Sequence, residues 1–376
     1  MIERRNIVDL WHRGDAVALA TLVRVEGSSY RRTGARLLIA ANGDYAGSIS
    51  GGCLDAEILR KAAWLVRDGA SIERYSTLYD DTAEMPYGLG CGGTVDLLLE
   101  PAGTPEFLSL MQALAVSLQG QSFTVETTLP TARQTLSRTI KTGDWPLATG
   151  NSSPDIAPSQ PDGMFIERIA PPQRLLLFGA GDDVQPMVRM AALLGWHVTV
   201  IDGRAHLARP DRFPDANSVL TCKATGWKGT GFSPSVPDGI TSEALASEGI
   251  TIGANDAAVI LSHSYEQDRA WLTALLPLQP RYLGLLGARH RSALLVAEAA
   301  ALLGWDVARA CEGLFAPVGL DLGGDGAEAI ALATIAEIQA CCEGKLGVSR
   351  RLTPNMVAEQ LAAGGASRYL QAQCAL

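Results

Sequence analysis

Two cysteines lie in glycine-rich segments where a thiolate could react or bind a soft metal. Cys53 follows Gly51 and Gly52 in SISGGCLDAEI, and Cys91 lies in YGLGCGG. We expect Cys53 in the first turn of a helix, where backbone N–H groups lower a thiol pKa and attract anions. Glycines also let a flat ligand approach the backbone. The pattern predicts that Cys53, Cys91 and both glycines bind a cofactor; the alternative is two small buried residues at tight turns.

A basic segment precedes Cys53 in a chain that is otherwise acidic. The segment GSSYRRTGAR contains Ser28, Ser29, Arg31, Arg32 and Arg36, whereas the chain has 31 Lys and Arg against 40 Asp and Glu. A guanidinium binds phosphate or carboxylate through two parallel hydrogen bonds, and a hydroxyl adds another. The segment therefore predicts a local anion site, with a solvated charged turn as the alternative.

A third glycine-rich segment has the pattern of a dinucleotide-binding loop. Gly179 and Gly181 follow the predicted strand RLLLF, and Asp202 ends the next predicted strand. Val184 replaces the third glycine, and Asp182 and Asp183 occupy the first helical turn, where they would repel a diphosphate. The segment predicts Rossmann topology and argues against tight NAD(P) binding. The alternative is that these glycines only allow a tight turn and bind no ligand.

Two polar residues follow later strands of the same predicted sheet. His263 comes after AAVILS, and Arg289 comes after YLGLLG. The carboxyl ends of parallel strands meet at one edge of a sheet, so both side chains are expected near Gly179 and Gly181. We expect this group, with Asp202, to form a second cofactor-binding region. For His263, a hydrogen-bonded structural role is an equal alternative.

The order of elements predicts an α/β protein with two domains. Residues 1–130 combine helical and strand periodicity, with a hairpin signal at Asn42 and Gly43, and form an α+β domain. Residues 131–171 are rich in Pro, Ser and Gly and are a linker or an extra hairpin. Alternating short strands and helices over 172–345 predict a Rossmann-like, doubly wound parallel sheet. Residues 346–376 form a tail.

Composition excludes several classes of protein. The net charge of −9 argues against nucleic acid or an anionic membrane as a partner. The seven cysteines contain no C-x-x-C pair and no zinc-like spacing, which argues against a zinc ribbon or a disulfide scaffold. The apolar runs are too short or too charged to span a membrane. We therefore expect a cytoplasmic protein with reduced thiols.

Seven segments together resemble the XdhC/CoxI family of xanthine dehydrogenase accessory proteins. They occur in the family's motif order and cover most of the chain: GSSYRRTGARLLI, GSISGGCLDAEI, YGLGCGG, LLLFGAGDDVQPMVRMAALLGWHVTVIDGR, VILSHSYEQD, YLGLLGARHR and PVGLDLGGDGAEAIALATIAEI. The resemblance implies an amino-terminal domain followed by a Rossmann domain, usually in a homodimer. It does not explain the segment from about 130 to 170.

The resemblance also implies a function. Family members are maturation factors that bind the molybdenum cofactor (molybdopterin) and protect it during sulfuration by a cysteine desulfurase. They then help to insert it into a xanthine dehydrogenase-type molybdenum hydroxylase. Cys53 matches the SGGC motif of the family and Cys91 its GCGG motif, so the resemblance makes both thiols candidate ligands to molybdenum. A cofactor chaperone is expected rather than a catalyst.

Two other functions stay open at the level of sequence. The first is an NAD(P)-dependent oxidoreductase, against which Val184 and the acidic first turn weigh. The second is a sulfur carrier in which Cys53 holds a persulfide and Cys91 lies near it.

Overall fold

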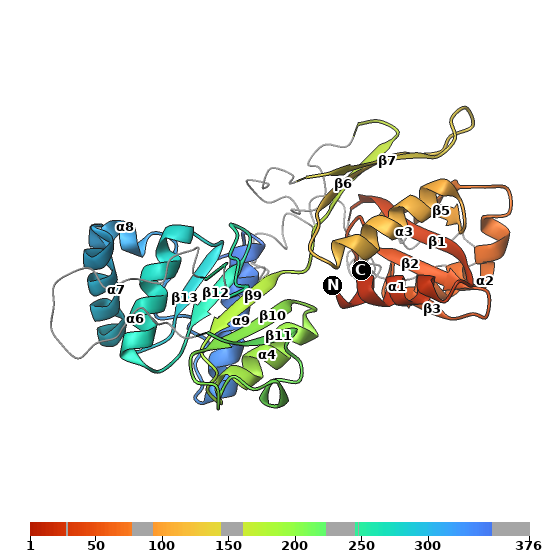
Figure 1. The fold of residues 1–376 in the computed structure, drawn as a ribbon. Helices are drawn as coiled ribbons and strands as arrows, with labels where there is room; N and C mark the ends of the chain where they lie inside the picture. Colours follow the sequence, from red (N-terminus) through yellow and green to blue (C-terminus); the bar gives the residue numbers. More distant parts are fainter. Residues whose placement is uncertain (28, 77–92, 144–160, 223–244, 247, 348–376) are drawn as a thin grey trace, which may run out of the picture.

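The computed structural model describes residues 1–27, 29–76, 93–143, 161–222, 245–246 and 248–347 (Figure 1). In these parts of the chain the strands form a five-stranded, a three-stranded and a six-stranded sheet. Helices cover the first and the last, and the small sheet follows the first in the chain. None of the helices in the described residues is long and apolar enough to cross a membrane.

The first sheet is antiparallel, with the order β3-β2-β1-β5-β4. Its strands are β1 (Ala16–Glu26), β2 (Arg36–Ala40), β3 (Tyr45–Gly47), β4 (Ser71–Ser76) and β5 (Thr94–Pro101). The predicted hairpin is confirmed between β2 and β3. Its turn is closed by a 2.9 Å hydrogen bond from Ala40 N to the carbonyl of Asp44, with Gly43 at a φ of 89°.

Both faces of this sheet are buried, because helices pack on each. Helices α1 (Ile2–His12) and α3 (Pro105–Ser117) cover one face, and α2 (Cys53–Leu65) covers the other. Successive residues of β2 point to opposite faces: Leu37 packs in the core beneath α2, and Leu38 in the core beneath α1 and α3. The strand therefore reads as a continuous apolar run instead of an alternating one.

The three-stranded sheet comprises β6 (Phe123–Thr128), β7 (Ser137–Thr142) and β8 (Met164–Ile169), in the order β7-β6-β8. Phe123, Val125 and Ile169 pack in the core that α1 and α3 form with the first sheet. Arg138 of β7 donates to the buried carboxylate of Glu100 on β5. The segment expected as a linker or extra hairpin thus contains two strands that are anchored to the first sheet.

The last sheet is parallel and has the order β11-β10-β9-β12-β13-β14. Its strands are β9 (Arg174–Phe178), β10 (His197–Asp202), β11 (Ser218–Thr221), β12 (Ala257–Ile260), β13 (Tyr282–Leu285) and β14 (Leu314–Phe315). This is the strand order of a Rossmann fold, in which the direction of winding reverses between the first and fourth strands. The predicted doubly wound sheet is therefore confirmed.

Helices cover both faces of the parallel sheet (Figure 1). On one face α4 (Val184–Leu193) packs beside α9 (Ala327–Cys342). On the other face α6 (Tyr265–Leu275) packs beside α7 (Arg289–Leu303), and α8 (Val307–Cys311) follows. Short 3-10 turns lie at Pro210–Arg212 and Leu276–Leu278. The loops after β9 and β12 meet at the reversal point, where ligands bind in open α/β sheets.

Candidate functional site

The loop that leads into α2 is organised by one buried carboxylate. Asp55 accepts hydrogen bonds from the backbone N–H groups of Ile49 (2.7 Å) and Gly52 (2.6 Å). The hydroxyls of Ser48 and Ser50 also donate to it, each at 3.0 Å. Asp55 is only 5% exposed, so this network replaces the water that the carboxylate loses on burial. The carboxylate therefore fixes the SISGG backbone that precedes Cys53.

The first turn of α2 receives a second set of contacts from the same loop. The Ser50 hydroxyl accepts from the backbone N–H groups of Leu54 (3.2 Å) and Asp55 (3.3 Å). The helix begins at Cys53, as the sequence predicts for that position. The Cys53 side chain, Cys91 and Ser28 lie outside the described residues. Their predicted roles therefore stay predictions.

The Arg31 loop and the SISGGC loop lie side by side in the first domain. One Glu3 carboxylate bridges them: its Oε1 accepts from Arg31 Nη2 (2.8 Å) and from the backbone N–H of Ser48 (3.1 Å). The Tyr30 ring lies against Gly51, where an added Cβ would come within 2.9 Å of the ring carbons. Gly51 has a φ of 88°, so both the conformation and the ring favour glycine there.

The three arginines of the basic loop have different partners. Arg36 is 8% exposed and donates to the Glu167 carboxylate of β8 and to the Gly34 carbonyl. Arg31 is paired with Glu3. The Arg32 side chain is exposed and has no hydrogen bond or ion pair with any residue that the structure describes. The sequence predicts an anion site from Arg31, Arg32 and Arg36, whereas the structure places Arg31 and Arg36 each on a carboxylate of the chain itself.

A cavity of ≈ 420 Å³ opens beside this loop. Its wall contains five arginines and two glutamates, contributed by α1, the basic loop, β8 and the residue after α9. They are Arg4, Arg31, Arg32, Arg36, Arg168, Glu167 and Glu343. Cavities of this size accommodate a small molecule. The site thus combines a basic wall with the Tyr30 ring, next to the loop that carries Cys53.

At the reversal point of the parallel sheet, the loops after β9 and β12 pass very close together. A Cβ at Gly179 would lie 2.3 Å from the carbonyl oxygen of Leu261, and Gly179 has a φ of 146°. The glycine predicted for a dinucleotide loop therefore has a packing role between strands. Gly181 follows in the same turn, where an added Cβ would lie 2.5 Å from a carboxylate oxygen of Asp183.

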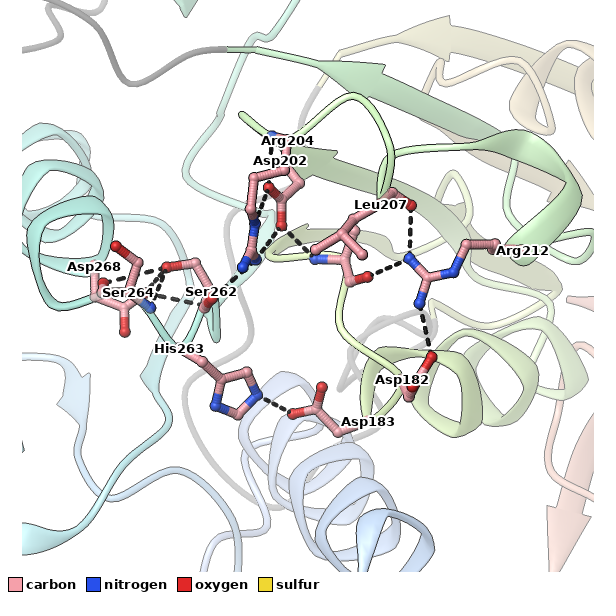
Figure 2. Close-up of polar contacts among 11 residues, drawn as sticks. Asp182, Asp183, Asp202, Arg204, Leu207, Arg212, Ser262, His263, Ser264 and Asp268 are labelled. Atoms are coloured by element: carbon pink, nitrogen blue, oxygen red, sulfur yellow. Dashed lines mark hydrogen bonds and ion pairs between the residues drawn. The ribbon is translucent and has the colours of Figure 1, made fainter.

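Asp202 is bound by the chain's own donors (Figure 2). It accepts from the backbone N–H of Ala180 (2.8 Å) and from the Arg204 side chain (2.7 and 2.9 Å). Burial alone would raise the Asp202 pKa, but the hydrogen bonds from Arg204 and Ala180 outweigh it and lower the pKa below its usual value. Arg204 also donates to the carbonyl of Ser262 after β12. Asp202, which was expected in a cofactor-binding region, therefore joins three loops of the sheet edge through its own contacts and those of Arg204.

Asp182 and Asp183, expected in the first turn of the helix, instead directly precede α4, which begins at Val184, and both are paired. Asp183 Oδ2 lies 2.8 Å from His263 Nε2, across the reversal point (Figure 2). Arg212 donates to Asp182 (2.7 Å) and to the carbonyl of Ala180 (2.7 Å). His263 has a φ of 59°, a backbone conformation that residues other than glycine rarely adopt. These pairs occupy the turn where a diphosphate would approach a Rossmann helix.

A fourth carboxylate ties α6 and α7 to the same edge. Asp268 is fully buried and accepts from the Ser262 hydroxyl (2.6 Å), the Ser262 backbone (3.0 Å) and Arg291 of α7 (2.7 Å). The side chain of Arg289, at the start of α7, is exposed and has no hydrogen bond or ion pair among the described residues. The structure thus brings Gly179, Gly181, Asp202 and His263 together. Their role in binding a cofactor stays a prediction.

The remaining described cysteines lie in ordinary settings. Burial raises the pKa of Cys222 and of Cys341, and it raises the pKa of Cys342 to about 12. These three thiols are therefore protonated at neutral pH and pack as small apolar groups. Cys311 is exposed. The described residues contain no group of three or more His, Cys, Asp or Glu side chains that could hold a metal ion.

Several residues of these networks were not predicted from the sequence. Asp55 stands three residues after Gly52, which is the spacing of a capping box. Its contact with the Gly52 backbone could therefore have been predicted from the local sequence. Glu3 lies 28 residues from Arg31, and Glu167 lies 131 residues from Arg36, so no local sequence pattern could predict either pair.

Two family models match the chain. The model described as the XdhC and CoxI family matches residues 10–76, and the model described as the XdhC Rossmann domain matches residues 175–338. The first match contains the basic loop and the SISGGC loop, and the second contains the reversal point of the parallel sheet. The chain therefore belongs to the XdhC/CoxI family.

Individual relatives are similar along most of their length. A probable xanthine dehydrogenase subunit of Bacillus subtilis is 28% identical, over 86% of this chain and 92% of the relative. The molybdenum cofactor insertion chaperone PaoD of Escherichia coli is 24% identical, over 89% of this chain and 86% of its own. A crystal structure described as a xanthine dehydrogenase from Bacillus halodurans is similar with a TM-score of 0.70, at 25% identity, and covers 94% of this chain and 99% of that one.

Proposed function

We propose that this protein binds the molybdenum cofactor, protects it during sulfuration by a cysteine desulfurase, and delivers it to a xanthine dehydrogenase-type molybdenum hydroxylase. One observation carries the proposal: Glu3 and Tyr30 join the SISGGC loop to the basic loop, which lines a cavity with Arg4, Arg168 and Glu343. The similarity to a relative named as a molybdenum cofactor insertion chaperone supports it.

The chemistry of the cofactor suits this side of the molecule. Molybdopterin has a flat pterin, a terminal phosphate and a metal held by soft sulfur ligands. Arginines bind phosphate, an aromatic ring such as Tyr30 can pack on a pterin, and thiolates such as Cys53 and Cys91 bind a soft metal. The cavity of ≈ 420 Å³ offers room for part of such a molecule. Cys53, at the start of α2, would hold the metal end.

The second domain would then support the first and contribute no catalytic step. The polar groups at its sheet edge bind one another, with Asp202 bound to Arg204 and Asp183 bound to His263. A dinucleotide would have to displace both pairs before its phosphates reached the start of α4. This observation favours a scaffold over a nicotinamide-dependent oxidoreductase.

Retention of the cofactor during gel filtration tests the proposal. Purified protein mixed with molybdopterin should elute with bound pterin, measured by pterin fluorescence. A variant with Cys53→Ala and Cys91→Ala should lose most of this pterin, because both proposed metal ligands are gone. Cys311→Ala is the matched control, since this exposed thiol lies outside the first domain, and it should retain as much as the wild type.

Full retention of pterin by the double variant would show that the two thiols do not bind the cofactor. No retention by the wild type would contradict cofactor binding altogether. Transfer is tested separately, by adding an apo form of a molybdenum hydroxylase to the loaded protein. Recovery of hydroxylase activity should exceed that obtained with free cofactor.

A further inference from the structure

The cavity beside the basic loop concentrates positive charge in an acidic protein. Five arginines and two glutamates line it, although the whole chain carries a net charge of −9. A surface of the average composition of this chain would carry more acidic than basic groups. The local excess of guanidinium groups is what an anionic ligand needs, because each can supply parallel N–H donors to its oxygens.

The backbone holds two of these arginines at a tight turn. Ala35 N donates to the carbonyl of Arg32 (3.2 Å), which closes the turn, and Gly34 N donates to the carbonyl of Leu22 on β1 (2.8 Å). Gly34 has a φ of 89°, which the turn requires. The turn is therefore part of the β1–β2 connection. Arg31 and Arg32 project from a fixed position at the cavity wall.

The two arginines differ in what they bind within the chain. The Arg32 side chain is exposed and has no hydrogen bond or ion pair with a described residue. Arg31 is bound by Glu3, with both side chains about one third exposed, so this pair is weak and exchangeable. Arg36 differs from both, because it is buried against Glu167 and is fixed by that contact. An incoming anion can therefore use Arg32 and compete for Arg31.

Glu3 connects this competition to the neighbouring loop. Its Oε1 accepts from both Arg31 and the backbone N–H of Ser48. A phosphomonoester carries about −1.5 to −2 charges at neutral pH and offers three acceptor oxygens, so it binds a guanidinium more strongly than one carboxylate does. When the ligand binds Arg31, Glu3 loses a partner, and its contact with Ser48 changes in consequence.

We propose that this cavity is a phosphomonoester site in which Arg32 and Arg31 bind the phosphate, while Glu3 competes for Arg31 and couples occupancy to the SISGGC loop. The inference rests on the proposed function only for the source of the phosphate, which would be the terminal phosphate of the pterin. The chemistry of the site is the same for a phosphate group from another small molecule.

Calorimetric titration of the full chain tests the site, with inorganic phosphate and adenosine monophosphate as probes in a phosphate-free buffer of low ionic strength. The wild type should show saturable binding of both. Arg32→Ala should weaken the affinity about tenfold, the loss expected for one charge-assisted contact. Arg133→Ala removes the same charge from an exposed position on the β6–β7 connection and should leave the affinity unchanged.

The role of Glu3 is tested by a double-mutant cycle. Glu3→Gln should tighten phosphate binding about threefold to tenfold, because Arg31 loses its competing carboxylate. In the Arg31→Ala background the same substitution should have no effect. Denaturant unfolding of each variant identifies any that does not fold. If Glu3→Gln does not fold, the Arg31→Ala and Arg32→Ala variants test the phosphate site by themselves.

Absence of saturable phosphate binding, or an unchanged affinity in Arg32→Ala, would overturn the site. An equal effect of Glu3→Gln with and without Arg31 would overturn the competition. Molybdopterin retention separates this inference from the proposed function. Phosphate binding without molybdopterin retention would preserve the site and contradict the function. Molybdopterin retention without phosphate binding would contradict the phosphate site and preserve the proposed function.

Discussion

The two domains each place a glycine-rich loop before a helix, but their carboxylates act in opposite ways. In the first domain Asp55 turns back into its own loop, and the nearby Arg32 is left at a cavity without a partner among the described residues. In the second domain the carboxylates instead pair with basic side chains. The pairs are Asp202–Arg204, Asp183–His263 and Asp182–Arg212. A glycine-rich turn therefore does not by itself define a ligand site. The location of the counter-charges decides whether the turn can bind an anion.

The difference also explains how a Rossmann fold can lack an open dinucleotide site. The third glycine position is Val184, which is fully buried against the sheet, and Asp182 and Asp183 directly precede the helix that begins there. Both features favour internal contacts over a bound diphosphate. The first domain has the converse arrangement, with the carboxylate of its helical turn satisfied by serine hydroxyls and backbone N–H groups.

The largest effect is expected at Asp55. Replacement by Ala would leave the backbone N–H groups of Ile49 and Gly52 without their acceptor inside a buried loop. We expect the free energy of unfolding to fall by about 3 kcal/mol, since each unsatisfied buried group costs roughly 1–3 kcal/mol. Denaturant unfolding measures this loss. Asp68→Ala, on an exposed side chain, should change stability by less than about 0.5 kcal/mol, and an equal loss in both variants would contradict the proposed role.

Asp202→Asn tests whether the second domain depends on its internal pairs. The amide cannot accept all the hydrogen bonds from Arg204 and Ala180, and Arg204 is only partly exposed. We expect a loss of about 2 kcal/mol in the free energy of unfolding. Asp211→Asn breaks a fully exposed pair with Arg209 and is the control. A variant as stable as the wild type would show that Asp202 does not hold the sheet edge together.

The contribution of Asp202 should also depend on pH. Its pKa is lower in the folded protein than the usual value of 3.8, so the unfolded chain takes up the proton first as pH falls. The stabilisation is present above about pH 4 and is lost as pH falls through the lower, folded pKa. The difference in stability between wild type and Asp202→Asn, about 2 kcal/mol at pH 7, should therefore shrink below pH 4. A difference that grows on acidification would contradict the sign.

The smallest effects are expected at His263. Its pair with Asp183 lies at the surface, so its loss costs about 0–1 kcal/mol, while glycine relieves the cost of the positive φ. His263→Gly should be within about 0.5 kcal/mol of the wild type. His263→Val should lose about 1–2 kcal/mol, because a β-branched residue tolerates this conformation poorly. Thermal unfolding of the two variants compares them, and equal stability would exclude backbone strain at this position.

Local patterns in the sequence predicted the elements better than the contacts between them. The β2–β3 hairpin followed from Asn42-Gly43, and the parallel sheet followed from alternating apolar strands and helices, because each signal lies within a few residues or a repeating unit. The pairing of Arg36 with Glu167 joins β2 to β8, 131 residues further along the chain. Nothing in the composition of either segment indicates that contact.

The candidate site shows the same limit. Glycines and arginines singled out two loops in the sequence, and the structure places Arg31 beside the SISGGC loop. The sequence could not indicate which arginine lacked a partner, because that depends on Glu3 and Glu167, which come from other elements. Of the three predicted arginines, Arg32 is therefore the one best placed to bind an anion, because its side chain has no described partner.

The most direct test compares the two domains in one binding measurement, the amount of molybdopterin per chain after gel filtration. One variant carries Cys53→Ala with Cys91→Ala in the first domain, and the other carries Asp183→Ala with His263→Ala in the second. If the first domain binds the cofactor, the cysteine variant should lose at least about 90% of the bound pterin, a tenfold change equivalent to about 1.4 kcal/mol. The second variant should retain as much as the wild type. Loss of pterin only in the Asp183 and His263 variant would contradict the assignment and place the cofactor at the edge of the Rossmann sheet.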